Sequence, residues 1–414
     1  PTLANVIYQI KHSKDTSPGP NGIPFVAYRA LLKAGGTTDP GPVMFRALQE
    51  LCSDNPPPSA FNRANLSLFP KNHSDYVGNS RPLAVNNTDN RMLAATVKHT
   101  VHDPIKEFLH PEQTGFVQGY DIRDNVIYFN DKFYKAKGLN KHYSFLLLDF
   151  AKAFDSVSHA FIHELLDSIG MPLWFRQVVR NLLSDVKLNV NQFGDFGFFI
   201  NVRRGVKQGC PLSPLIFNLI IDVLIHNLKN LPNPPDIAAY ADDVGLGATD
   251  PRQYKPLAGV VHVFGIFSGL LLNVTKTKLL LAADDDHDYI RTFLTGTHWE
   301  SVPISDTGVY LGVLFGRDIF LDDIYQAAGE KMVNRLKALI TVRHRYAMYK
   351  RVIICNVFVF PIFSYLHNFF CIPKGIYDVV YQCLTVFLNP MQSSYKWTLL
   401  THPRGFFSLN PPLT

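Results

Sequence analysis

Hydrophobic and polar positions along this chain follow two spacings, one typical of buried strands and one typical of amphipathic helices. Residues 144–148 form a nearly continuous apolar run, which is typical of a central strand covered on both faces. Apolar residues recur at helical spacing between Ser158 and Gly170. Serine is suited to begin a helix and glycine to end one, so this segment predicts a helix. Two short strand patterns, at 237–241 and 244–248, flank an acidic pair and predict a hairpin. Together these patterns predict an α+β fold with an antiparallel sheet.

The rest of the pattern predicts a second hairpin, a long apolar helix and a helical C-terminal region. Strand-like runs at 187–192 and 196–202 flank a turn that contains a glycine. A helix is expected from Ser213 to about residue 228, with proline at a first-turn position that tolerates it. Beyond Arg317 the pattern becomes mainly helical, so we expect a subdomain boundary there.

The apolar segment 352–371 is nearly long enough to span a membrane. It also contains asparagine, serine, histidine and proline residues, whose polar groups would be unfavourable in lipid without partners. We therefore predict a buried helix pair that is broken at Pro361, and no contact with a membrane.

The composition is that of an ordinary globular protein, with 47% hydrophobic and 18% charged residues among 414. The net charge of +6 is modest, and it indicates a polyanionic partner only if the basic residues cluster. Five cysteines without C-x-x-C spacing indicate neither a disulfide framework nor a zinc module, which favours a reducing compartment. Because the chain begins at Pro1 within helical sequence, we interpret it as a piece of a longer polypeptide.

Two acidic sites carry the strongest indication of chemistry. Asp149 directly follows the buried strand, and Asp242 and Asp243 lie at the tip of the predicted hairpin. Adjacent carboxylates repel one another unless a cation lies between them. Mg²⁺ prefers such oxygen ligands, and two ions stabilise the attacking and leaving oxygens of an in-line phosphoryl displacement. For the hairpin alone, a solvated turn rich in aspartate is an equally good interpretation.

Three segments resemble motifs A, B and C of reverse transcriptases, and those of non-LTR (LINE-type) retrotransposons in particular. They are Phe145–Asp155 (FLLLDFAKAFD), Gly205–Pro214 (GVKQGCPLSP) and Tyr240–Asp243 (YADD). Further segments agree with this family in the same order, namely Ser17–Pro24, Arg81–Leu83, Gln113–Phe116, Ser268–Leu270 with Asn273 and Lys276–Thr277, and Tyr310–Gly312. The resemblance extends from Val6 to Gly316 and is far more specific than a single acidic pair.

The resemblance implies a right-hand polymerase with fingers at 1–143, a palm with finger insertions at 144–316, and a thumb with a helical extension at 317–414. The implied activity is RNA-directed DNA synthesis in retrotransposition. It implies two Mg²⁺ ions, with Mn²⁺ as a substitute, held by Asp149, Asp242 and Asp243. The implied partners are an RNA template, a DNA primer, dNTPs and other domains of a longer polyprotein. By family analogy, the location is nuclear or cytoplasmic.

Roles for single residues follow from the same resemblance. The Phe150 carbonyl matches a further metal ligand, and Phe154 matches an aromatic gate against the ribose 2′-hydroxyl, although a core aromatic is an equal interpretation. Gln208 and Gly209 match a loop beside the templating base and the incoming nucleotide. The other matched positions are Lys71 and Arg81 for the triphosphate, Lys276 (or Lys278) as general acid toward pyrophosphate, and Tyr310, Leu311 and Gly312 for the primer grip.

Two alternatives stay open at this point. The same fold serves group II intron-type maturases and domesticated reverse transcriptases, and a decayed element would retain RNA binding without catalysis. Retention of all three aspartates argues against decay. The helical stretch 331–351 contains seven lysines and arginines among apolar residues, which favours a thumb that follows phosphates over a simply solvated face.

Overall fold

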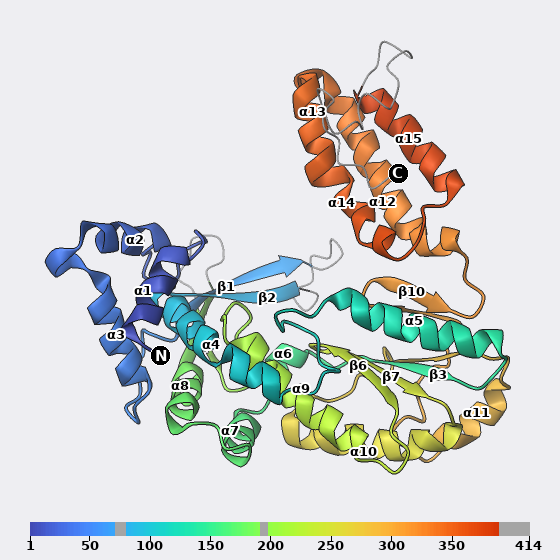
Figure 1. Cartoon of the computed structure of the whole chain (residues 1–414), viewed down its shortest axis with the longest axis horizontal. Helices are drawn as coiled ribbons and strands as arrows, with labels where there is room; N and C mark the ends of the chain where they lie inside the picture. The colour runs from blue at the N-terminus through green and yellow to red at the C-terminus, as the bar shows by residue number, and fades with distance from the viewer. Residues whose placement is uncertain (71–79, 191–197, 389–414) are drawn as a thin grey trace. The chain divides into compact units, whose positions relative to one another are not determined.

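The computed structural model describes residues 1–70, 80–190 and 198–388 (Figure 1). The chain divides into two compact units. The first unit comprises Pro1–Ile122, Leu146–Leu279 and Asp286–Pro303. The second unit comprises Arg123–Phe145, Leu280–Asp285 and the chain from Ile304 onward. Each unit is described by itself below.

The first unit opens with three helices that pack together and against a fourth. Their bounds are α1 (Leu3–His12), α2 (Phe25–Ala34), α3 (Pro40–Leu51) and α4 (Thr88–Phe108). A capping box between Thr2 and Asn5 begins α1, and its apolar face buries Val6 and Ile10. Asp39 caps α3, which has proline at its first position. These local signals explain why helices form at the N-terminus of the chain.

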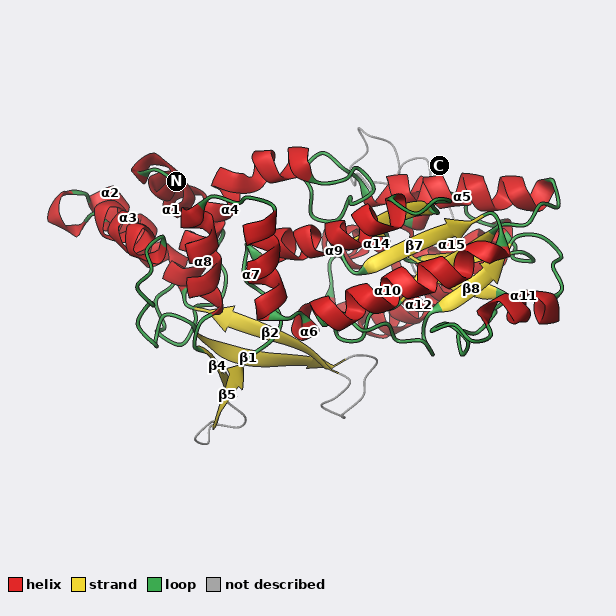
Figure 2. Ribbon diagram, turned by 90° about the horizontal axis from the view of Figure 1, so that it is seen from below, coloured by secondary structure: helices red, strands yellow, loops and turns green. Residues whose placement is uncertain are grey.

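A four-stranded mixed sheet follows these helices, with the order β2-β1-β4-β5 (Figure 2). Its strands are β1 (Arg63–Pro70), β2 (Ser80–Asn86), β4 (Val186–Val190) and β5 (Phe198–Val202). The predicted hairpin is confirmed, because β4 pairs with β5 in antiparallel register from Val186 opposite Val202. The sequence did not predict that β1 pairs in parallel with β4, which joins two distant segments of the chain.

A second four-stranded sheet carries the acidic sites, with the order β6-β7-β3-β8. Its strands are β3 (Ser144–Leu148), β6 (Asp236–Tyr240), β7 (Asp243–Ala248) and β8 (Lys278–Leu281). Every residue of β3 is buried, as predicted for a central strand. β6 and β7 form the predicted antiparallel hairpin. The fold is therefore mixed helix and sheet, with an antiparallel hairpin at the acidic pair.

The first unit also contains further helices (Figure 2). They are α6 (Ala153–Ser156), α7 (His159–Ser168), α8 (Leu173–Leu183), α9 (Ser213–Lys229), α10 (Tyr254–Ser268) and α11 (His287–Leu294). The side chain of Ser158 caps α7 as predicted. α9 buries residues on all sides and packs against α10, which explains its continuous apolar sequence.

The second unit contains a long helix, a short hairpin and a helical bundle. Its elements are α5 (Ile122–Gly138), β9 (Thr307–Tyr310), β10 (Val313–Gly316), α12 (Leu321–Val342), α13 (Met348–Ile354), α14 (Pro361–Ser364) and α15 (Lys374–Leu388). α12 packs along α15 (Figure 1). A π-helical turn at Cys355–Val359 precedes Pro361, and the backbone of Phe360 between them stays right-handed helical, so the sharp break predicted at Pro361 is not present. Val357 and Phe358 are exposed, so the segment is not wholly buried as predicted. Within the described ranges, no helix has both the length and the apolarity required to cross a bilayer.

Candidate active site

The hairpin of β6 and β7 places two carboxylates at its tip. Tyr240 pairs with Asp243, so the loop consists of Ala241 and Asp242 alone. Ala241 has a left-handed backbone with φ of 55°, a conformation that two-residue loops usually assign to glycine, asparagine or aspartate. The backbone turns sharply here, and Asp242 is half-buried while Asp243 is exposed.

Asp149 lies at the end of β3 and is held by the segment 273–277. Its backbone N–H donates to Thr277 Oγ1 at 3.2 Å, and its carbonyl accepts from the Asn273 N–H at 2.7 Å. Thr277 is fully buried, so this hydrogen bond is shielded from solvent. Lys276, the predicted proton donor, belongs to this same segment and is exposed. The structure thus brings Lys276 into the loop that holds Asp149.

Asp149 and the hairpin tip are close enough to interact electrostatically. Asp243 is exposed as a residue, but its carboxylate is partly desolvated by the surrounding protein, which disfavours the charged form and raises its pKa. The negative charges of Asp242 and Asp149 raise this pKa further. Together these effects bring the pKa of Asp243 to about 6. Three carboxylates from two distant segments therefore share one negatively charged region.

The donor set at this region suits hard divalent cations. All three side chains offer carboxylate oxygens, and an added cation would relieve their mutual repulsion. Among the residues that the structure describes, no three acidic, histidine or cysteine side chains form a ready-made metal cage. Mg²⁺ does not require one, because it is usually bound by one or two carboxylates together with water and substrate phosphates.

Removing the charge of Asp243 should stabilise the metal-free protein at neutral pH. The folded-state pKa of about 6 lies above the ordinary value of 3.8, so ionisation favours the unfolded chain as the pH rises through this interval. We expect Asp243→Asn to melt at a higher temperature than the parent at pH 7.5 in EDTA. The difference should shrink toward pH 5. Identical melting curves at both pH values would contradict the repulsion.

The loop 205–210, which resembles motif B, is held between the strand β2 and the loop after Asp149. The Val206 N–H donates to the Phe154 carbonyl at 2.8 Å, and the Ala84 N–H donates to the Gln208 carbonyl at 2.9 Å. The Gln208 side chain donates to Asp155 Oδ1 at 3.0 Å. The structure therefore joins three segments that the sequence marked separately.

The other residues predicted to contact the nucleotide differ in how exposed they are. Phe154 is half-buried, and its ring stacks on that of Phe217 with centroids 4.4 Å apart. The ring of Phe150 is buried. Arg81 is exposed on β2. Lys71 lies outside the described residues.

Lys207 is buried in the same loop, and its role was not predicted from the sequence. Its Nζ donates to Asn62 Oδ1 at 3.2 Å, and burial lowers its pKa to about 8. Asn62 in turn donates to the carbonyls of Asn181 and Ser184, both at 2.7 Å. A buried polar network therefore ties this loop to the residue before β1 and to the C-terminal end of α8.

The predicted primer grip forms the hairpin of β9 and β10 in the second unit. The ring of Tyr310 is buried among aromatic side chains, with Phe145 at 5.3 Å. Leu311 and Gly312 make the turn, with φ of 47° and 79°, and the Tyr365 hydroxyl donates to the Leu311 carbonyl at 2.6 Å. Contact with a primer from this hairpin would come from its tip rather than from the tyrosine ring.

The basic helical stretch of the second unit is partly used for internal contacts. Arg335 donates to the Phe358 carbonyl, Arg343 to the Val386 carbonyl and Arg351 to those of Tyr346 and Phe387. The remaining basic residues of this stretch, Lys331, Lys337, Arg345 and Lys350, are exposed. Phosphate contacts from this stretch would therefore depend on the exposed group.

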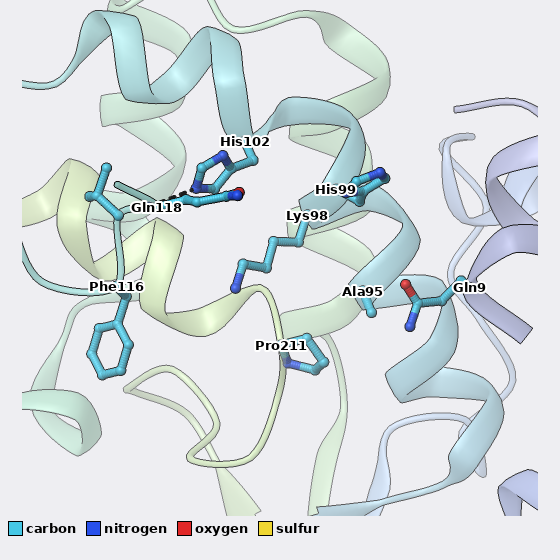
Figure 3. A pocket seen from close by; sticks show the side chains of 9 residues that line it. Gln9, Ala95, Lys98, His99, His102, Phe116, Gln118 and Pro211 are labelled. Carbon is cyan, nitrogen blue, oxygen red and sulfur yellow. Dashed lines mark hydrogen bonds between the residues drawn. The ribbon is translucent and has the colours of Figure 1, made fainter. Parts of the chain in front are cut away.

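A separate cavity of about 450 Å³ lies beside α4 in the first unit (Figure 3). Lys98, His99 and His102 of α4 line it, with Phe116 and Pro211 on other segments. The Lys98 side chain extends into it (Figure 3). None of the aspartates at 149, 242 and 243 lines this cavity.

Residues 69–315 match the family model described as "Reverse transcriptase (RNA-dependent DNA polymerase)". The match covers more than half of the sequence. The chain belongs to the reverse transcriptase family. This finding confirms the resemblance on which the site residues were chosen. Their individual roles remain predictions.

Proteins of non-LTR retrotransposons are among the relatives of this reverse transcriptase chain. It is 28% identical over 323 residues to the uncharacterized 149 kDa protein of transposon TX1 from Xenopus laevis, covering 75% of the chain and 24% of that relative. It is 29% identical over 274 residues to the Pol polyprotein of the R2DM element from Drosophila melanogaster, covering 64% of the chain and 25% of that relative. The chain therefore spans about a quarter of the length of these two relatives.

The fold is also similar to that of telomerase. The structure of telomerase from Candida albicans with a TWJ fragment of telomeric RNA aligns with 91% of this chain and 60% of its own, at a TM-score of 0.50 and 10% identity. At this identity the similarity concerns the fold alone. It agrees with the predicted right-hand polymerase fold.

Proposed function

We propose that this chain catalyses RNA-templated DNA synthesis. It would add one deoxynucleotide at a time to a primer, each chosen by pairing with the next template base. The primer 3′-hydroxyl releases its proton to water, and its oxygen forms a bond to the α-phosphorus of a dNTP. The bond from this phosphorus to the oxygen that bridges the α- and β-phosphates breaks, and pyrophosphate leaves. The observation that carries the proposal is the convergence of Asp149 with the turn at 242–243 in a member of this family. Charge placement and substrate positioning would supply most of the acceleration.

Reverse transcriptases generally use divalent metal ions. In this chain Asp149, Asp242 and Asp243 would hold two Mg²⁺ ions, or Mn²⁺ as a substitute, with the Phe150 carbonyl as a further ligand. When bound, the ions would supply positive charge to the attacking and leaving oxygens. Lys276 would donate a proton to the departing pyrophosphate, and Lys278 is the second candidate for that role.

The substrate contacts follow the same placement. Arg81 on the exposed side of β2 would bind triphosphate oxygens, together with Lys71. Gln208 and Gly209, held against β2, would lie beside the nucleotide and the templating base. The RNA template and DNA primer would extend over fingers (1–143), palm (144–316) and thumb (from 317). Because the relatives are much longer, further domains of a polyprotein would supply target cleavage and priming.

The relatives named above are retrotransposon proteins, which supports this function over that of an intron maturase. The decisive experiment measures Mg²⁺-dependent incorporation of dTTP on poly(rA)/oligo(dT). Incorporation that disappears on chelation supports the proposal. A folded chain that binds the template and incorporates nothing in Mg²⁺ or Mn²⁺ would refute it.

Phe154→Val should weaken discrimination against ribonucleotides. A smaller side chain removes the ring that would collide with a 2′-hydroxyl, so the ratio of kcat/KM for dTTP to that for rUTP should fall roughly 10- to 100-fold. Steady-state incorporation of both nucleotides on the same template measures this ratio. If Phe154 is only a core aromatic stacked on Phe217, both activities will fall in proportion and the ratio will stay constant.

A further inference from the structure

The segment Gln113–Phe116 runs beside the strand that leads to the acidic turn. The Thr114 N–H donates to the Ala239 carbonyl at 2.9 Å, and the Ala239 N–H donates to the Glu112 carbonyl at 2.8 Å. Gln113 and Ala239 form a parallel bridge. The segment thus continues the sheet on the free side of β6 and reaches the hairpin tip.

The side chain of Gln113 binds the strained residue of that tip. Its Oε1 accepts the Ala241 N–H at 3.1 Å and the Gly115 N–H at 3.0 Å. Gln113 is 1% exposed, so water does not offer these two N–H groups another acceptor. Ala241 has the disfavoured left-handed backbone, which persists only where the surroundings hold it.

The contact is close as well as polar. A Cβ on Gly115 would lie 2.3 Å from the Ala241 nitrogen, so only glycine allows this approach. The Gly115 carbonyl accepts from the Asn218 side chain at 2.5 Å, which fixes the segment against α9. Gln113 Nε2 is buried and makes no hydrogen bond within the described structure, which is unfavourable for stability. The side-chain oxygen of Gln113 is therefore satisfied, while its side-chain nitrogen is not.

We propose that Gln113 is a positioning residue for the polymerase reaction. By holding the Ala241 N–H it fixes the direction in which the chain enters Asp242 and Asp243, and so the placement of both carboxylates. This inference rests on the proposed function for its effect on catalysis. Its structural part, that Gln113 holds the turn, stands independently.

Gln113→Met tests the proposal, because methionine has a similar length and lacks the acceptor. We expect kcat for dTTP incorporation to fall roughly 10- to 100-fold with little change in KM for primer–template, since small displacements of catalytic groups have effects of this size. The Mg²⁺ concentration for half-maximal rate should rise. Hydrogen exchange measured by mass spectrometry should accelerate at residues 240–243, without any substrate present.

Gln253→Met is the matched control. Gln253 is 3% exposed, and its Oε1 accepts the Thr249 and Asp250 N–H groups at 2.8 and 3.0 Å, just beyond the opposite end of β7. This variant should accelerate exchange at 249–250 and leave kcat within about twofold, because that end of the hairpin lies away from the carboxylates. If Gln113→Met does not fold, Gln113→Asn withdraws the same acceptor by one carbon and should show the same pattern more weakly.

The two parts of the inference fail in different ways. Unchanged exchange at 240–243 in the Gln113 variants would overturn it, even if the unsubstituted chain proved inactive and the proposed function were lost. Accelerated exchange with unchanged kcat and Mg²⁺ dependence would also overturn it, by showing that the turn tolerates the loss. If kcat fell as much in Gln253→Met as in Gln113→Met, the loss would come from general destabilisation, and the positioning role of Gln113 would be refuted.

Discussion

Asp242→Asn is expected to reduce primer extension on an RNA template at least about a thousandfold. Asparagine keeps the shape of the side chain and removes the charge that a hard cation requires. A loss of about 4 kcal/mol of transition-state stabilisation corresponds to this factor. Binding of primer–template should change little, because phosphate contacts come from basic groups elsewhere in the chain. Single-turnover extension and fluorescence anisotropy measure the two effects separately.

Asp236→Asn provides a control in the same hairpin. Asp236 begins β6 and pairs with Gly247, at the opposite end from the turn. Its substitution should leave extension near the parental rate. Undiminished extension by Asp242→Asn would refute the metal assignment. If Asp242→Asn weakened template binding and Asp236→Asn did not, Asp242 would have a structural role instead.

The elements that the sequence predicted well are those with local causes. The strand at 144–148 was predicted with the bounds that the structure has, because complete burial leaves a continuous apolar run. The helix after Ser158 was predicted because its cap and its terminating glycine are adjacent to its apolar face. The acidic hairpin likewise combines strand patterns with turn residues.

The features that the sequence did not predict depend on contacts between distant segments. The parallel pairing of Arg63 with Lys187 has no local signal, because each strand has the same pattern whichever neighbour it takes. The burial of Lys207 contradicts the usual exposure of lysine and depends on a partner at position 62. Tyr310 matched the primer grip, yet its ring lies in an aromatic core.

The same limit applies to the candidate site. Motif resemblance predicts Asp149, Asp242 and Asp243 as metal ligands, and in the structure the charges of Asp149 and Asp242 act on Asp243. It also matched the segment Gln113–Phe116 without giving it a role. That role became visible only when the structure showed Gln113 bound to Ala241, a contact between residues far apart in the chain. Spacing along a chain identifies ligands more readily than it identifies the groups that position them.

Gly209→Ala should displace the loop 205–210 from β2 and so impair use of the incoming nucleotide. Gly209 has φ of 113°, which disfavours any side chain, and an added Cβ would lie 2.6 Å from the Ala84 carbonyl oxygen. The loop must then move away from β2, which breaks the hydrogen bond from Ala84 to the Gln208 carbonyl. We expect kcat/KM for dTTP to fall about 100-fold and stability to fall by about 2 kcal/mol.

Gly296→Ala separates backbone strain from this collision. Gly296 also has a left-handed backbone, with φ of 71°, but no atom lies within 4 Å of its added Cβ. This control should lower stability by about 1 kcal/mol through strain alone and leave nucleotide kinetics unchanged. Melting temperatures and dTTP kinetics of both variants decide between the causes. If Gly209→Ala lost stability but kept parental dTTP kinetics, the seating of this loop on β2 would be a matter of folding and not of nucleotide binding.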